Sequence, residues 1–242
     1  MSESDSPGPQ PTGTATTPGR RAPWVLWVVA LGGIALAYSP MWLPRMLDAV
    51  GLERGVRSPA SSIVWNVIAV AALLAYVFAV ERRPLGSIGL RRPRAKDLEW
   101  ALYLFGIVMV WQWIVLTFFP PAAGSGTADS GTATIAALPI AAVLGLIVSS
   151  AVCEEILFRG YPIERLSELT GRRWVAYALT VPLFVAPHLV FFGPQWLWTS
   201  GVGALALYVL YARTRNLPAG MLLHLALNLP ILIPTLAHHT AQ

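Results

Sequence analysis

The sequence predicts an all-α membrane protein, a multi-pass bundle of about seven transmembrane helices. Of its 242 residues, 55% are apolar and only 12% are charged, whereas soluble domains carry about 25% charged residues. Several stretches without a formal charge are longer than the roughly 20 residues that a helix needs to cross a bilayer. The arginines that give the chain its formal charge of +5 lie in the short gaps between these stretches. We therefore expect them to orient the chain in a membrane rather than to bind nucleic acid.

The polar N-terminal segment differs in composition from the rest of the chain. Fifteen of residues 1–23 are Ser, Thr, Gly or Pro, too few apolar side chains to build a core. No apolar region follows a short basic start, as it would in a signal peptide. We expect a disordered cytoplasmic tail.

The predicted spans follow from the distribution of charge. The first four uncharged stretches are residues 22–44, 58–80, 100–127 and 129–153. The next, residues 174–212, has 39 residues and no formal charge apart from His188. At about 1.5 Å per residue it would be nearly 60 Å long as one helix, so we expect two spans with a turn at Gly193-Pro194. A seventh span follows Arg215.

The orientation follows from lysine and arginine. Fourteen of them lie in the tail and in residues 81–98, 159–173 and 213–215, and three lie in the opposite loops. Because positive charge stays on the cytoplasmic side, we expect the N-terminus inside and the C-terminus outside. In a bacterial host this membrane would be the plasma membrane.

The first unusual cluster of polar residues ends the fourth span, in AVCEEILFRGYP (151–162). On an α-helix Glu155 and Arg159 lie four residues apart on one face, in the favourable order of acid before base. Glu154 points about 100° away and has no partner on its own helix, so its pKa would be raised and it could serve as a general base. The alternative is a salt bridge at the membrane surface, with Glu154 simply solvated.

Two further clusters lie on later spans. His188 follows Pro187 deep in an apolar span, and His224 and Asn228 are four residues apart, so that they share a helix face. Each could be structural, because His and Asn often pack or hydrogen-bond between membrane helices. However, the first four spans contain no intramembrane Asp, Glu, Lys, Arg or His up to residue 153. This concentration of costly residues on three helices favours one functional site.

The depth of Glu154 depends on where Arg159 lies. If Arg159 marks the membrane surface, Glu154 is only about 7 Å deep, too shallow to meet His188. If Arg159 pairs with Glu155 inside the bundle, the surface moves to Glu164 and Arg165, and Glu154 lies about 15 Å deep. We favour the second arrangement, which lowers the cytoplasmic count of basic residues to thirteen.

The three clusters resemble the EExxxR, FxxxH and HxxxN motifs of the CPBP family, the CAAX prenyl endopeptidases and bacteriocin-processing or bacteriocin-immunity proteins. The matching residues are Glu154, Glu155 and Arg159, then Phe184 and His188, then His224 and Asn228. The similarity covers about residues 134–237, and SIGLRRPR (87–94) resembles the stretch before that family's core. Residues 24–133, the first three spans and their loops, match only in being apolar.

The resemblance implies an intramembrane endopeptidase with a cavity open to the cytoplasmic side. It implies that Glu154 and His188 activate a water and that His224 and Asn228 hold the oxyanion. The residues alone suggest similar roles: an unpaired base, an imidazole and two donors on a separate helix. The expected substrate is a membrane-associated protein or peptide; the oligomeric state is left open.

Metal use and function each have alternatives. A catalytic zinc needs three protein ligands, and Glu155, His188 and His224 could supply them. We favour a metal-free glutamate mechanism without a cofactor, because the chain contains no HExxH and Glu155 already has Arg159. The alternatives to an enzyme are a non-proteolytic immunity or binding scaffold and a transporter, although a transporter usually shows internal repeats and we see none.

Overall fold

The computed structural model describes residues 23–51, 59–119 and 130–240, and within them every regular element is a helix. The predicted polar tail lies outside the described residues, apart from its last position. The α-helices are α1 (Pro23–Ala37), α2 (Ser39–Ala49), α3 (Pro59–Tyr76), α4 (Ala95–Phe118), α5 (Ser130–Ala136), α6 (Ile140–Ser149), α7 (Tyr161–Thr170), α8 (Arg173–Phe192), α9 (Gly201–Thr214), α10 (Leu217–Asn228) and α11 (Leu232–Thr240). Two π-helical segments, η1 (Val77–Glu81) and η3 (Ser150–Gly160), extend α3 and join α6 to α7, and 3₁₀ turns occupy Leu85–Ile88, Pro194–Leu197 and Leu229–Ile231.

The all-α membrane fold is confirmed, with a difference in the number of spans. In the described part of the chain, five helices are long and apolar enough to cross a membrane, and the bent pair α1–α2 would make a sixth. The segment expected as the sixth of seven spans holds only α9, whose 14 residues reach about 21 Å. The turn at Gly193-Pro194 is where we expected it, but a 3₁₀ turn and a further turn follow it before α9 begins. The first stretch is also not straight, because α1 and α2 meet at 70°.

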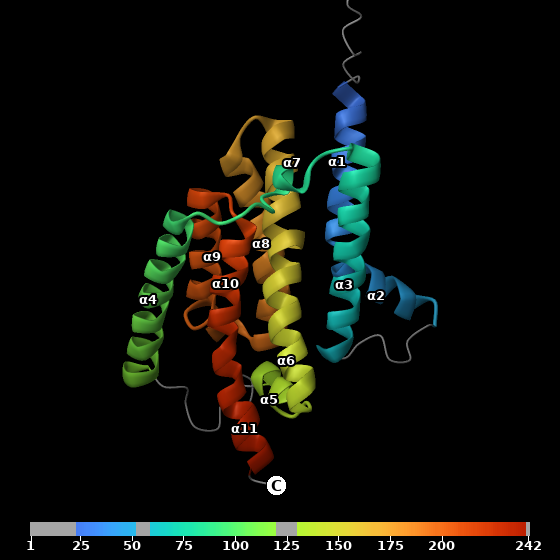
Figure 1. The fold of residues 1–242 in the computed structure, drawn as a ribbon. Helices are drawn as coiled ribbons and strands as arrows, with labels where there is room; N and C mark the ends of the chain where they lie inside the picture. The colour runs from blue at the N-terminus through green and yellow to red at the C-terminus, as the bar shows by residue number, and fades with distance from the viewer. Residues whose placement is uncertain (1–22, 52–58, 120–129, 241–242) are drawn as a thin grey trace, which may run out of the picture.

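The helices pack around one long central rod (Figure 1). This rod runs from α6 through η3 into α7, and it packs against α10, α8, α3 and α1. Helix α4 lies at the other side of the bundle, against α9 and α10. The central rod therefore contacts both halves of the chain, and the polar residues that it carries face into the bundle.

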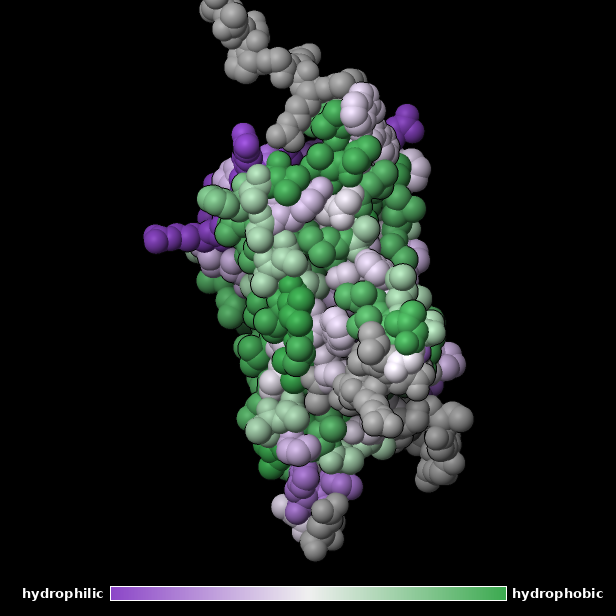
Figure 2. All heavy atoms as spheres, turned by 90° about the vertical axis from the view of Figure 1, so that its right-hand side faces the viewer, coloured by the Kyte–Doolittle hydropathy of each residue, from purple (hydrophilic) through white to green (hydrophobic). Residues whose placement is uncertain are grey.

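The outer surface suits a bilayer. On the face near α1 and α3, hydrophobic side chains extend over most of the height, and hydrophilic ones gather near the two ends (Figure 2). Val64, Val67 and Ile68 of α3, for example, are each more than half exposed. In water such a surface would be unfavourable, so these side chains are expected to contact lipid.

Glu164 and Arg165, which we expected near the membrane surface, are buried inside the protein. Arg165 makes three hydrogen bonds of 2.6–3.0 Å to the Glu81 carboxylate at the end of η1. Glu164 accepts hydrogen bonds from Arg215 and from the Tyr211 hydroxyl. These contacts tie α7 to η1 and α9. The helical rod continues to Thr170, and the depth of the site in the membrane stays a prediction.

The topology can be checked by accessibility. Helix α1 begins at the upper end of the bundle and α11 ends at the lower end (Figure 1). With the basic loops inside, we expect a tag in the tail or in residues 81–98 to be accessible from the cytoplasm and a tag after α11 to be accessible from outside. A cytoplasmic C-terminus would contradict this orientation and would indicate that the short α9 is not a full span.

Candidate functional site

The central π-helical segment η3 carries the first polar cluster. Its hydrogen bonds span five residues, as in the bond from the Tyr161 backbone N–H to the Ile156 carbonyl. Segments of π-helix are rare, are usually single-turn bulges and are frequent at functional sites. The angle of 100° that we expected between the Glu154 and Glu155 side chains applies to an α-helix. A π-helix has more residues per turn, so the angle between consecutive side chains is smaller. The two carboxylates therefore point in more similar directions.

The predicted pair between Glu155 and Arg159 is confirmed. Arg159 Nη1 lies 2.6 Å from Glu155 Oε1, and both side chains are fully buried. The centre of the guanidinium group lies 4.5 Å from the ring centroids of both Phe184 and Tyr208. An arginine against aromatic faces gains cation–π stabilisation, so Arg159 is held by one carboxylate and two rings.

Glu155 also binds the second helix of the site, α10. His224 Nδ1 donates a hydrogen bond of 2.9 Å to Glu155 Oε1. Gly220, one turn before His224, allows this approach, because a Cβ at residue 220 would lie 2.8 Å from Glu155 Oε2. The sequence motifs did not predict this bond or the need for glycine, although a small residue four positions before a histidine is a usable signal of close helix packing.

Glu154 faces the same imidazole from the other side. Its side chain is 16% exposed, and its Oε2 lies 3.9 Å from His224 Nε2. As expected, the described residues give Glu154 no ion pair on its own helix. Its neighbour comes from α10 instead, so one imidazole lies between two carboxylates.

His188 is fixed by its own helix and by aromatic rings. Its Nδ1 lies 2.8 Å from the Phe184 carbonyl oxygen, and because a carbonyl can only accept, Nδ1 carries the proton. In the neutral ring, Nε2 is then an acceptor. The Phe184 ring lies 4.5 Å from the His188 ring and also packs against the Arg159 guanidinium, so α8 places His188 beside the polar cluster.

Asn228 lies one turn beyond His224 and is held by Ser150, a residue that the sequence motifs did not single out. Its Nδ2 donates a hydrogen bond of 2.9 Å to Ser150 Oγ, and Ser150 Oγ lies 3.3 Å from the Ile147 carbonyl. An amide nitrogen carries two N–H donors, so this bond uses one of them. The role of Asn228 as an oxyanion donor is compatible with this geometry and stays a prediction.

The residues suggested as zinc ligands are engaged in other contacts in the described part of the chain, and metal use stays a prediction. In residues 23–51, 59–119 and 130–240, no three His, Cys, Asp or Glu side chains come together as a metal-ligand set. Of the suggested ligands, Glu155 already binds Arg159 and His224, and His188 uses Nδ1 for a carbonyl. A metal at this site would require these side chains to rearrange.

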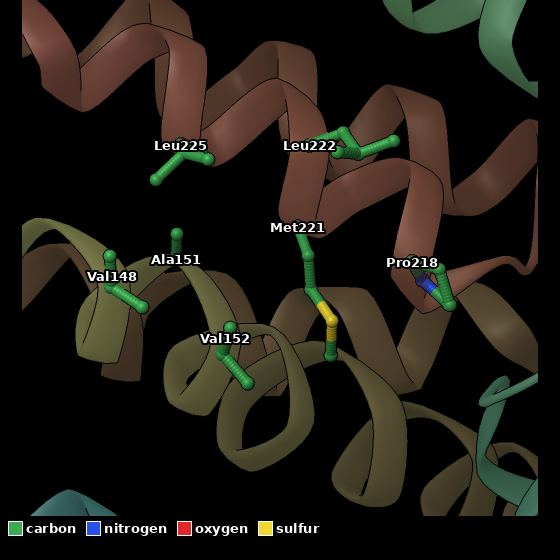
Figure 3. Close-up of a pocket in the computed structure, with 7 residues that line it drawn as sticks. All are labelled: Val148, Ala151, Val152, Pro218, Met221, Leu222 and Leu225. Carbon is green, nitrogen blue, oxygen red and sulfur yellow. The ribbon is translucent and has the colours of Figure 1, made fainter.

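An apolar pocket lies beside the site, between the central rod and α10 (Figure 3). Its volume is about 320 Å³. It is lined by Val148, Ala151, Val152, Pro218, Met221, Leu222 and Leu225. Val152 and Met221 are close in sequence to Glu154 and His224, and the large exposed fractions of Val148 and Leu222 place the pocket at the outer, lipid-facing surface.

One comparison with known protein families gives a match in this region. Residues 136–230 match the family described as Rce1-like: type II CAAX prenyl endopeptidase Rce1-like. The matched segment begins at the end of α5 and includes every polar residue of the site. No curated protein and no solved structure matches the chain.

Proposed function

Because residues 136–230 of this chain match the Rce1-like type II CAAX prenyl endopeptidases, we propose that it is an intramembrane endopeptidase in which Glu154 activates the attacking water. The observation that carries this proposal is the geometry of the polar cluster. One carboxylate is engaged in a buried ion pair, while the other, Glu154, lies partly exposed beside an imidazole. A carboxylate without a strong hydrogen-bond partner is the better base of the two.

The water would be held between Glu154 and His188. With Nδ1–H on the Phe184 carbonyl, Nε2 of His188 can accept one hydrogen of this water. Glu154 takes the other proton as the oxygen attacks the peptide carbonyl carbon, which gives a tetrahedral intermediate with a negative oxygen. The proton then passes to the leaving amine, and the carbon–nitrogen bond breaks.

The negative oxygen would be stabilised from α10. Asn228 supplies an N–H donor, which Ser150 orients. His224 can donate from Nε2 only when it carries a second proton, because Nδ1 donates to Glu155. Glu154 and Glu155 lie on either side of the ring, so the positive charge of that form would be balanced within the site.

Glu155 and Arg159 would hold other residues of the site in position rather than contact the substrate. Both are fully buried, and Glu155 fixes the ring of His224 through its 2.9 Å hydrogen bond. Such a buried network limits how far the catalytic groups move from their productive positions. Even small displacements of these groups lower the rate of turnover.

The substrate class follows from the surroundings of the site. The pocket of Figure 3 is lined by apolar side chains and lies next to the segment that carries Glu154. We propose a membrane-associated protein or peptide whose scissile bond lies close to an apolar segment or group. A soluble, charged peptide would have to cross unfavourable surface to reach Glu154.

A cleavage assay with the purified protein in detergent tests this function. We expect membrane-associated peptides to be cut by the wild-type protein and the activity to survive treatment with a chelator. Loss of activity on chelation that zinc restores would reject the metal-free mechanism and make Glu155, His188 and His224 metal ligands. Absence of cleavage under all conditions would favour a non-proteolytic scaffold.

Replacing Asn228 tests the oxyanion role. We expect Asn228→Ala to lower kcat by about a hundred- to a thousandfold, the usual loss for one such donor, with a smaller change in KM. Ser150→Ala, which leaves the amide present but unsupported, should give a smaller loss in the same direction. An unchanged kcat in Asn228→Ala, measured with the same substrate, would remove Asn228 from the mechanism.

A further inference from the structure

The ring of His188 is enclosed by aromatic side chains. Its centroid lies 4.5 Å from that of Phe184, 4.7 Å from that of Trp196 and 6.1 Å from that of Phe192. The angles between the His188 plane and these rings are only 34°, 27° and 19°, respectively. Phe184 belongs to the family motif and Phe192 ends the same helix, whereas Trp196 comes from outside α8.

Trp196 is brought to this position by a turn that folds back on the end of α8. Gly193 has a φ of +86°, a value that favours glycine. The Trp196 N–H bonds to the Gly193 carbonyl at 3.1 Å, and Gln195 Nε2 bonds to the Phe192 carbonyl at 2.6 Å. The indole is 6% exposed, so the turn ends with a buried ring stacked on His188.

The hydrogen bond from His188 to its own helix fixes Nδ1 but does not by itself fix the tilt of the ring. Pro187 precedes His188, and proline removes one backbone hydrogen bond and can bend a helix. The χ2 torsion of histidine is broad, so the single bond from Nδ1 to the Phe184 carbonyl leaves freedom for the ring to tilt. A large ring stacked on the imidazole restricts this tilt and keeps water from its face.

We propose that Trp196 is a positioning residue that holds the His188 ring with Nε2 directed to the attacking water. This inference rests on the proposed function of His188. Trp196 does not contact the substrate; it acts through the orientation and tautomer of the imidazole. Ordinary core packing would also bury an indole, but it would not require the ring of Trp196 to be parallel to that of His188.

The test compares Trp196→Leu, which fills space without a stacking face, with Trp196→Phe, which keeps one. We expect Trp196→Leu to lower kcat by about ten- to a hundredfold, as for a small misplacement of a catalytic group, with KM within about twofold of the wild type. Trp196→Phe should recover most of this loss. Trp198→Ala, which removes an exposed indole from the same turn, is the matched control and should leave both constants unchanged.

A nitrogen-15 NMR spectrum of the histidines supplies a readout that does not depend on cleavage. The His188 signals are identified by their loss in His188→Gln. We expect one Nδ1–H tautomer in the wild type and in Trp196→Phe, and a mixture of tautomers in Trp196→Leu. If Trp196→Leu keeps both the wild-type kcat and a single tautomer, Trp196 is not a positioning residue.

The two readouts separate this inference from the proposed function. If Glu154→Gln cleaves as well as the wild type, or if no preparation cleaves at all, the proposed function fails. The tautomer of His188 in Trp196→Leu then decides alone whether Trp196 fixes the ring. If the wild type cleaves and Trp196→Leu is unaffected, the function stands and the inference is wrong.

Discussion

Glu154→Gln is expected to abolish peptide cleavage while the protein still folds and inserts. Glutamine has nearly the same shape as glutamate but cannot take a proton from water. Its neighbour His224 keeps its hydrogen bond to Glu155, so the rest of the site should be preserved. The measurement is kcat of the purified variant on a substrate of the wild-type protein, together with its thermal unfolding in the same detergent.

A matched control for this variant is Glu168→Gln. Glu168 is a half-exposed carboxylate on α7 that pairs with Arg83 at the upper end of the bundle, about four helical turns further along the central rod than Glu154. Its replacement should leave kcat unchanged. Retained cleavage in Glu154→Gln would reject the assignment of the base.

Arg159→Ala is expected to lower the free energy of unfolding by about 3–5 kcal/mol, the usual cost of breaking a buried ion pair. The change leaves the Glu155 carboxylate in a fully buried position, where His224 is its remaining partner among the described residues. It also removes the guanidinium group that packs against the rings of Phe184 and Tyr208. Denaturant or thermal unfolding of the purified protein in detergent measures the loss.

Arg83→Ala provides the comparison for this prediction. Arg83 and Glu168 form an ion pair of similar length, 2.5 Å, but their side chains are 41% and 44% exposed. An exposed pair is worth only about 0–1 kcal/mol, so Arg83→Ala should unfold almost as the wild type does. Equal stability of the two alanine variants would contradict a buried ion pair at Arg159.

Much of the fold could be predicted because the cost of charge in a bilayer marks where helices cross. The same cost predicted that Arg159 pairs internally with Glu155, since a free arginine at that depth is unfavourable. It did not predict that Glu164 and Arg165 are buried in the protein. Their charges are neutralised by Glu81 and Arg215 from distant segments, a pairing that one sequence does not reveal.

The finer geometry of the site could not be predicted for a related reason. The π-helical form of η3 depends on packing around it rather than on a local sequence signal, and it changes the angle between Glu154 and Glu155. The contacts of Ser150 with Asn228 and of Trp196 with His188 join residues from different helices and turns. The spacing of residues along one helix predicts which side chains share a face of that helix, but not these contacts between different segments.

A comparison of membrane-bound peptides tests most directly whether Glu154 drives proteolysis, because the substrate need not be known. Membranes are prepared from cells that express the wild-type chain or Glu154→Ala at equal levels, and the ends of the recovered peptides are identified by mass spectrometry. We expect peptide ends that depend on Glu154 and that lie beside apolar segments or groups. Identical sets of peptide ends in the two membranes, with both proteins folded and inserted, would contradict a protease that uses Glu154 as its base.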